Sequence, residues 1–190
     1  MRVKPRKLQA GDVAPDIKAT DVSGNAIRLK KIDSHYVLVV FFRYSGCPWC
    51  NLAIHRLSLE YKTLKNHGCE VITFVQSKKA DIVDNIYSRQ APKPKFPIVA
   101  DSERAFYDAY GVQDSAITAI RSVKKVPIWF HAIKDHGFMQ KTVDGNLFLV
   151  PASFLLDGRT KKVLQANYGT SYYETDAFMD IYSSVFYKVL

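Results

Sequence analysis

The chain has 190 residues, of which 47% are hydrophobic and 24% are charged, so it can bury a full core without disulfide bonds. Its three cysteines are too few for a secreted disulfide framework, and they favour a reducing compartment. No apolar segment follows the basic N-terminus as it would in a secretory signal, and the longest apolar run, Tyr36–Phe42, is too short to cross a bilayer. We therefore expect a cytoplasmic protein without a membrane partner.

The formal net charge is +9, and the lysines and arginines are spread over several segments. A nucleic-acid-binding protein usually concentrates its basic residues on one recognisable motif, and the sequence contains no such motif. The charge therefore indicates a basic, solvated surface, and we expect no nucleic-acid partner.

The first part of the chain predicts a basic arm, a hairpin and a buried strand. Residues 1–10 are expected to form a loose arm, and residues 11–190 a single domain. Turn signals at 11–15 and 21–25 bracket short apolar pieces, which predicts a β-hairpin extension. Tyr36–Phe42 is apolar at every position, which is typical of a strand covered on both faces of a sheet.

A long helix and a second strand complete a βαβ unit. The helix is predicted to begin at Pro48, because apolar residues then recur at spacings of three and four, and to end at Gly68. Residues 71–75 form the next buried strand. Further along we expect a helix at 79–90, a strand at 98–100, a helix at 102–110, a β-hairpin at 154–168 and a C-terminal amphipathic helix. Residues 112–148, with helical pieces at 115–125 and 129–134, are interpreted as an insertion.

The chemistry is expected at Cys47-Pro48-Trp49-Cys50, where a Cys-x-x-Cys motif follows a buried strand and opens a helix. Pro48 suits the first helical position, which places Cys47 at the N-cap. There its sulfur would face free backbone N–H groups and the positive end of the helix dipole, which stabilise a thiolate. Cys47 is therefore predicted to attack from the surface, and Cys50, shielded one turn further on, to resolve the mixed disulfide. Arg43 either adds positive charge near the thiolate or is an ordinary surface cation. Trp49 is expected to be exposed beside the motif, where it either shapes the contact with substrate or merely caps the surface.

Residues 9–50 resemble the start of the peroxiredoxin-like alkyl hydroperoxide reductase/thiol-specific antioxidant (AhpC/TSA) family. The resemblance is carried by Gly11, Ala14-Pro15-Asp16, Asp21, Gly24, Leu29 and the run from Phe41 to Leu52 that contains the two cysteines. It implies a thioredoxin-like α/β fold, in which a central mixed sheet is flanked by helices. It also implies a thiol-dependent oxidoreductase that uses its own cysteine pair in place of a cofactor and takes electrons from thioredoxin or glutathione. The sequence is compatible with an oligomer.

The chain departs from the family pattern near the cysteines. Typical peroxiredoxins place a proline seven positions and a threonine or serine three positions before the attacking cysteine, where this chain has Val40 and Tyr44. The late arginine of typical members is replaced by Val150-Pro151. This pair resembles the cis-proline that faces the cysteines in thioredoxin folds, and it is expected to offer the Val150 backbone to an extended thiol substrate. These departures favour disulfide exchange over peroxide reduction, whereas the N-terminal segment favours peroxide reduction.

Two other interpretations of the cysteines stay open. The pair could form half of a zinc site, although Cys69, His55 and His67 would have to complete it. Alternatively, the protein could be a redox-inert binding module that reuses the fold. Cys69 stands alone at the start of a strand and is interpreted as a small buried hydrophobe.

Overall fold

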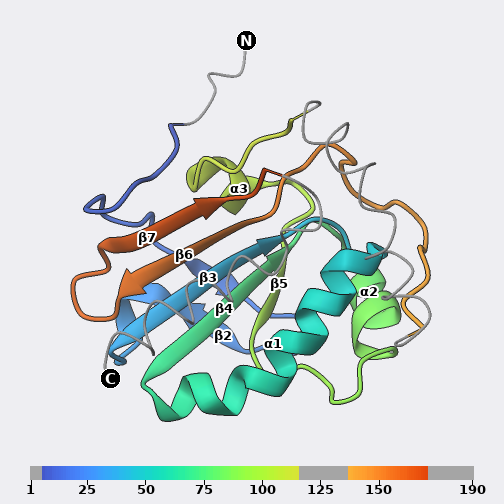
Figure 1. Cartoon of the computed structure of the whole chain (residues 1–190), viewed down its shortest axis with the longest axis horizontal. Helices are drawn as coiled ribbons and strands as arrows, with labels where there is room; N and C mark the ends of the chain where they lie inside the picture. The colour runs from blue at the N-terminus through green and yellow to red at the C-terminus, as the bar shows by residue number, and fades with distance from the viewer. Residues whose placement is uncertain (1–5, 116–136, 171–190) are drawn as a thin grey trace.

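The computed structural model describes residues 6–115 and 137–170 of the chain (Figure 1). Its centre is a five-stranded mixed sheet in the order β5-β4-β3-β6-β7, beside a separate two-stranded hairpin, β1-β2. The strands are β1 (Lys18–Thr20), β2 (Ala26–Arg28), β3 (Tyr36–Phe42), β4 (Cys69–Val75), β5 (Ile98–Ala100), β6 (Ala152–Asp157) and β7 (Val163–Tyr168). The helices are α1 (Pro48–Asn66), α2 (Lys79–Ile82) and α3 (Ala105–Ala109), with a 3-10 turn at Leu29–Lys31 and a π-helical turn at Val83–Tyr87.

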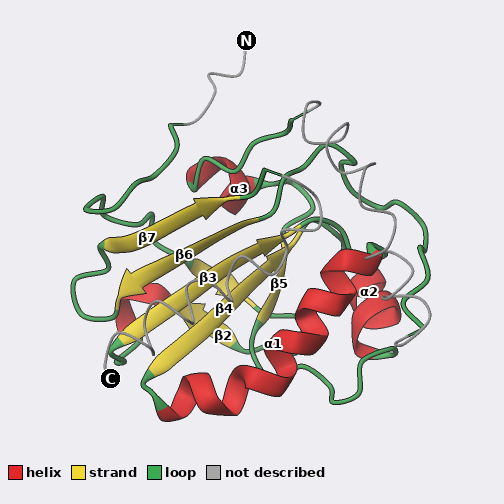
Figure 2. Cartoon of the chain, in the orientation of Figure 1, coloured by secondary structure: helices red, strands yellow, loops and turns green. Residues whose placement is uncertain are grey.

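The sheet is mixed because its two halves are connected differently. β3, β4 and β5 run parallel to one another through helical crossovers, whereas β6 pairs antiparallel with β3 and then turns back into β7. Helices lie on both sides of this sheet (Figure 2). This is the thioredoxin-like α/β arrangement that the family resemblance predicted.

Strand β3 is buried on both faces, as its continuous apolar sequence predicted. Leu38, Val40 and Phe42 belong to the core that α1 covers. The alternating residues Val37, Val39 and Phe41 belong to a second core, which includes residues of the hairpin and of α3. The strand therefore rigidly positions the segment that leaves its C-terminal end at Arg43.

Most of the predicted elements are confirmed, but three details differ. Helix α1 begins at Pro48, and Gly68, at φ +70°, follows its last turn as expected. The predicted helix at 79–90 is shorter, because α2 passes into the π-helical turn at Ile82. The arm is not loose at residues 6–10, since the Leu8 N–H donates to the Tyr168 hydroxyl at 2.7 Å. The strand predicted at 71–75 begins two residues earlier, at Cys69.

The insertion has no helix or strand in the part that the structure describes after residue 136. Residues 137–149 form an extended segment, coloured orange in Figure 1, that passes near the N-terminal end of α1 and near α2. The helical pieces predicted within 116–136 and the C-terminal helix lie outside the described residues. Among the described helices, none is both long and apolar enough to cross a membrane.

The turn between β6 and β7 requires a glycine at 158. A Cβ built on Gly158 would lie 1.8 Å from the Ser34 carbonyl oxygen, and this backbone atom cannot move aside cheaply. We expect Gly158→Ala to lower the free energy of unfolding by roughly 1–3 kcal/mol, as measured by urea denaturation. The neighbouring exposed change Arg159→Ala is the control and should have an effect within about 0.5 kcal/mol. Equal stability of the two variants would contradict the close approach.

Candidate active site

The loops that follow the parallel strands meet at one end of the sheet. The segment from Arg43 to Gly46 leaves β3 and enters α1 at Pro48. It is fixed to the loop after β4, because the Gln76 N–H donates to the Arg43 carbonyl oxygen at 2.8 Å. The Ser45 N–H donates to the Ser77 hydroxyl at the same distance. The carboxyl ends of parallel strands are where α/β folds commonly place their sites.

Cys47 occupies the N-cap of α1, as predicted, with Pro48 at the first helical position. Its sulfur accepts no capping hydrogen bond of ordinary geometry. Burial raises its pKa, but the Cys50 thiol, the Arg43 guanidinium and the N–H groups of Cys50 and Trp49 outweigh burial. The resulting pKa of Cys47 is about 6, well below the usual value, so the thiolate predominates at neutral pH.

Arg43 is a buried cation beside the Cys47 sulfur and not a surface residue, since its exposed fraction is 1%. One terminal nitrogen, Nη1, lies 3.6 Å from the Cys47 Sγ. Its Nε donates to the Leu149 carbonyl oxygen at 3.1 Å, and Nη2 donates to the Leu147 carbonyl oxygen at 2.7 Å. Of the two interpretations of Arg43, the geometry therefore supports the cation near the thiolate.

Cys50 lies one helical turn after Cys47 and is 1% exposed. Burial raises the pKa of Cys50 well above its usual value, and the neighbouring Cys47 raises it further. Cys50 therefore keeps its proton and donates it toward the Cys47 sulfur. An anionic sulfur beside a protonated one is the arrangement needed for attack followed by resolution.

Two expectations about exposure are wrong. Cys47 is not on the surface, because its exposed fraction is 0%. Trp49 is half-buried and packs against the core that contains both cysteines. Sequence reasoning missed the surroundings of the motif because residues 137–149, which lie far from it in the chain, contact the loop that leads into Cys47.

Val150-Pro151 does not form the expected cis-proline shelf. Among the described residues the cis peptide bond is Ala91–Pro92, so the prediction of a cis bond at Pro151 is wrong. The Val150 N–H is also engaged, since it donates to the Gln113 carbonyl oxygen at 3.3 Å. Val150 is 7% exposed, which leaves little of it for a substrate to contact.

Asn51 and Tyr44 support the motif and were not singled out from the sequence. Asn51 is fully buried, and its Nδ2 donates to the carbonyl oxygens of Ser45 at 2.7 Å and Cys47 at 3.0 Å. This holds the loop before the helix in place. The hydroxyl of Tyr44 donates to Gln140 at 3.2 Å. The sequence does carry one signal for the role of Asn51, which is a polar residue at a helical position that is buried.

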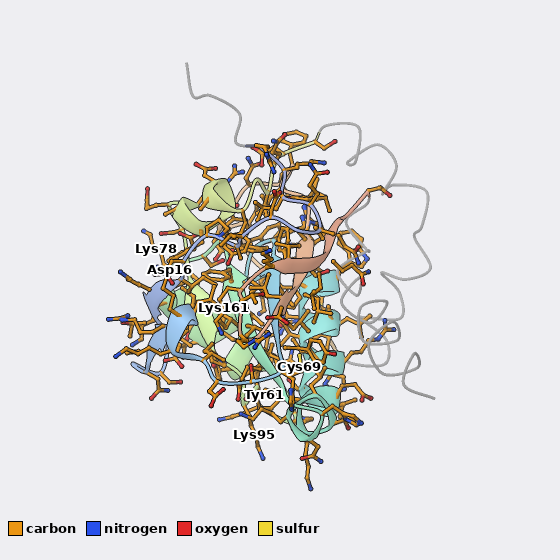
Figure 3. All side chains as sticks on the ribbon, turned by 90° about the vertical axis from the view of Figure 1, so that its left-hand side faces the viewer. Asp16, Tyr61, Cys69, Lys78, Lys95 and Lys161 are labelled. Carbon is orange, nitrogen blue, oxygen red and sulfur yellow. The ribbon has the colours of Figure 1, made fainter. Side chains whose placement is uncertain are left out.

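Cys69 takes no part in this cluster. It lies at the beginning of β4, toward the end of α1 that carries Tyr61 (Figure 3), and burial raises its pKa to about 12. This agrees with its interpretation as a buried hydrophobe. Within residues 6–115 and 137–170, no group of three or more His, Cys, Asp or Glu is placed to hold a metal ion.

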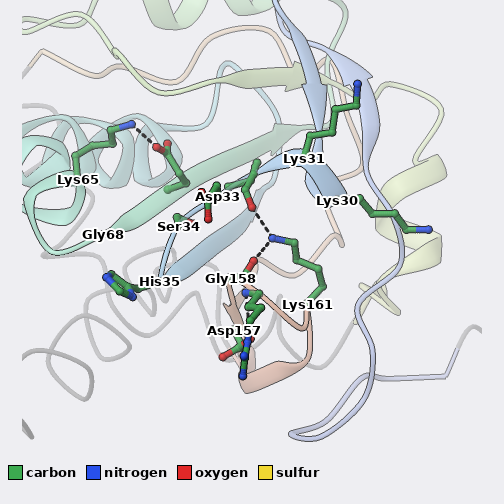
Figure 4. A pocket seen from close by; sticks show the side chains of 13 residues that line it. Lys30, Lys31, Asp33, Ser34, His35, Lys65, Gly68, Asp157, Gly158 and Lys161 are labelled. Atoms are coloured by element: carbon green, nitrogen blue, oxygen red, sulfur yellow. Dashed lines mark hydrogen bonds and ion pairs between the residues drawn. The ribbon is translucent and has the colours of Figure 1, made fainter.

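A separate hollow of about 870 Å³ lies away from the motif (Figure 4). Its lining comes from the start of β3, the end of α1 and the β6–β7 turn, and includes Lys30, His35, Lys65, Gly158 and Lys161. The Lys161 ammonium points to backbone oxygens, including that of Ile32 at 2.7 Å. Neither cysteine of the motif lines this hollow.

Comparison of the sequence with known protein families identifies the family of this chain. Residues 10–163 match the AhpC/TSA family. The chain belongs to this family. It is 26% identical to peroxiredoxin Bcp of Escherichia coli (strain K12) over 156 aligned residues, and this alignment covers 81% of this chain and 82% of that protein. It is also 27% identical over 106 residues to the thiol-disulfide oxidoreductase ResA of Bacillus anthracis, covering 56% of this chain and 60% of the relative.

The fold of this AhpC/TSA protein is also that of solved members of the group. The structure of the peroxidoxin BcpB from Mycobacterium tuberculosis matches with a TM-score of 0.67 at 14% identity, covering 96% of this chain and 99% of the other. Family membership establishes a thiol-dependent redox enzyme of the peroxiredoxin-like type. Both peroxide and disulfide chemistry occur among the named relatives of this AhpC/TSA protein.

Proposed function

We propose that the protein reduces a hydroperoxide at Cys47, with Cys50 as the resolving thiol. The observation that carries the proposal is the enclosed thiolate: Cys47 is fully buried, and Arg43 lies 3.6 Å from its sulfur. A buried sulfur suits a substrate of a few atoms better than a disulfide held in a polypeptide. The cation keeps the sulfur ionised despite burial.

The reaction follows from the two protonation states. The Cys47 thiolate attacks one oxygen of the hydroperoxide, the O–O bond breaks, and the departing alkoxide takes up a proton to become an alcohol. Cys47 is thereby oxidised to a sulfenic acid. The Cys50 sulfur then attacks the Cys47 sulfur, a disulfide forms, and the hydroxyl leaves with the Cys50 proton as water. Two equivalents of an external thiol reduce the disulfide and are themselves oxidised to a disulfide.

Arg43 compensates in part for the absence of the threonine or serine that typical peroxiredoxins carry three positions before the attacking cysteine. The position three before Cys47 holds Tyr44, which has no short hydroxyl side chain to offer a peroxide. The Arg43 guanidinium instead places a positive charge beside the reacting sulfur, where it also stabilises the negative charge that develops on the leaving oxygen. The Arg43 charge therefore favours peroxide reduction despite the absence of the threonine, which from the sequence alone favoured disulfide exchange.

Disulfide exchange is the second candidate function. It is favoured by the Cys-x-x-Cys spacing itself and by the similarity to ResA. For either function we propose that the cysteine pair carries the electrons without a bound cofactor. Thioredoxin or glutathione would be the donor, and the cytoplasm would be the compartment that keeps such donors reduced.

Parallel assays on the reduced protein separate the two functions. Hydrogen peroxide and cumene hydroperoxide are supplied with a thioredoxin or glutathione reducing system, and their consumption is compared with the reduction of insulin disulfides. We expect rapid peroxide consumption and slow insulin reduction. The reverse result would favour disulfide exchange. If neither reaction occurs and the two thiols form no disulfide at any potential, the redox-inert binding module would be supported.

A further inference from the structure

The loop that leads into Cys47 is covered by residues 137–149, here named the strap. Each of the four residues before Cys47 contacts it. Arg43 donates to two strap carbonyl oxygens, and the Tyr44 hydroxyl donates to Gln140. The Ser45 hydroxyl donates to the Asp144 carboxylate at 2.8 Å. The Gly46 carbonyl accepts the Lys141 N–H at 3.1 Å, and a Cβ on Gly46 would meet the strap backbone at 2.6 Å.

The strap is anchored at both ends by side chains. Near its start the Phe138 ring is 2% exposed and packs against Leu52, and Arg89 donates to strap carbonyl oxygens at 3.1 and 3.0 Å. Near its end the Asn146 N–H donates to the Gln76 side chain at 2.9 Å, and Asn146 Nδ2 donates to Asp114. Its outer side exposes large apolar residues, namely Met139, Val143, Leu147 and Phe148.

These anchors can be released without unfolding the sheet. The strap lies outside the named strands, and its β-type pairing among the described residues is an isolated bridge between Leu149 and Asp114, which also lies outside those strands. A segment held by side-chain hydrogen bonds and loop contacts, without strand pairing to the sheet, opens at a lower free energy than the core does. A local opening of the strap would therefore uncover the loop that leads into Cys47 while β3 and α1 stay folded.

We propose that the strap is a size gate for Cys47. With the strap closed, a small hydroperoxide reaches the sulfur through side-chain motion alone. A thiol or disulfide carried on a polypeptide reaches it only after the strap lifts. The gate confines the oxidising half of the cycle to small substrates and makes the reducing half depend on opening. It rests on the proposed function in that Cys47 is taken as the reactive thiol.

The test measures alkylation of Cys47 by a small and a bulky reagent in a Cys50→Ser, Cys69→Ser background. Iodoacetamide is the small reagent, and a maleimide carrying a long polyethylene glycol chain is the bulky one. The strap is loosened by Phe138→Ala with Asp144→Ala, which removes the buried anchor and the bond to Ser45. The matched control is Met139→Ala with Val143→Ala, two exposed strap residues.

In the loosened variant we expect the bulky reagent to react about tenfold faster and iodoacetamide to change by less than about threefold. The control should match the parent with both reagents. An equal acceleration of both reagents, no acceleration of the bulky one, or the same acceleration in the control would overturn the gate. Circular dichroism verifies folding, and Gln140→Ala with Asn146→Ala repeats the test while leaving the core untouched.

Peroxide consumption distinguishes failure of the gate from failure of the proposed function. It is measured with the same strap variants in the chain that retains all three cysteines. A size-dependent change in alkylation without any peroxide consumption would reject the peroxidase but keep the gate. Peroxide consumption with alkylation that does not depend on reagent size would reject the gate alone.

Discussion

Replacing Cys47 with serine is expected to lower the rate of peroxide consumption by about a thousandfold or more. A serine hydroxyl stays protonated where the Cys47 thiol, with a pKa of about 6, is ionised, so the nucleophile is lost. The measurement is the initial rate of peroxide loss in the presence of excess reducing thiol. Because serine is nearly isosteric with cysteine, the change leaves the helix N-cap in place.

Replacing Cys50 with serine should have a different effect. The first attack on peroxide needs only Cys47, so one equivalent of peroxide should disappear, while the sulfenic acid then persists because the resolving thiol is absent. Dimedone labelling followed by mass spectrometry detects this intermediate. Cys69→Ser is the matched control and should keep full activity, since Cys69 lies at the start of β4 and takes no part in the cluster. If Cys50→Ser abolished the first turnover and Cys47→Ser did not, the two roles would be reversed.

The local features of the site could be predicted from the sequence because they depend on neighbouring residues. A proline at 48 and a glycine at 68 mark the ends of α1, and these two signals alone place Cys47 at the N-cap and Cys50 one turn further on. The apolar run Tyr36–Phe42 predicts a strand with two covered faces, and both cores confirm it. Each of these inferences uses the periodicity of one element.

The environment of Cys47 could not be predicted, because it is built from distant segments. The Leu147 and Leu149 carbonyl oxygens that orient Arg43 lie more than a hundred positions further along the chain. No periodicity connects them to the motif, so Cys47 was expected at the surface. The same reason accounts for Val150-Pro151: a proline before a late strand resembles the family pattern, but whether its peptide bond is cis depends on tertiary packing.

The burial of a thiolate raises the question of what keeps it ionised, and Arg43 gives a testable answer. Burial alone would raise the pKa of Cys47 above its usual value. The N–H groups at the start of α1 and the Cys50 thiol act against it, but Arg43 is the only full positive charge among these influences. A cation 3.6 Å from the sulfur, with both side chains at most 1% exposed, interacts strongly with the thiolate.

Arg43→Met is therefore expected to raise the pKa of Cys47 by about one to two units. In the unmodified protein the rate of alkylation by iodoacetamide should rise as the pH passes through about 6 and then level off, because only the thiolate reacts. In the variant the same rise should occur at a higher pH. At pH 7 alkylation should then be about two- to tenfold slower, and at alkaline pH the two rates should converge.

Two further variants separate the charge of Arg43 from its hold on the strap. Arg43→Lys keeps a cation near Cys47 but cannot contact the sulfur and both carbonyl oxygens at once, so the midpoint should move less than in Arg43→Met. Arg89→Met removes a strap anchor whose charge is not among the main influences on the Cys47 pKa, and its midpoint should stay near 6. If Arg89→Met shifted the midpoint as far as Arg43→Met does, loosening of the strap would explain the change. If the charge acts directly, the pH midpoint should shift only when residue 43 is replaced, because among these variants only that side chain brings a positive charge to the sulfur.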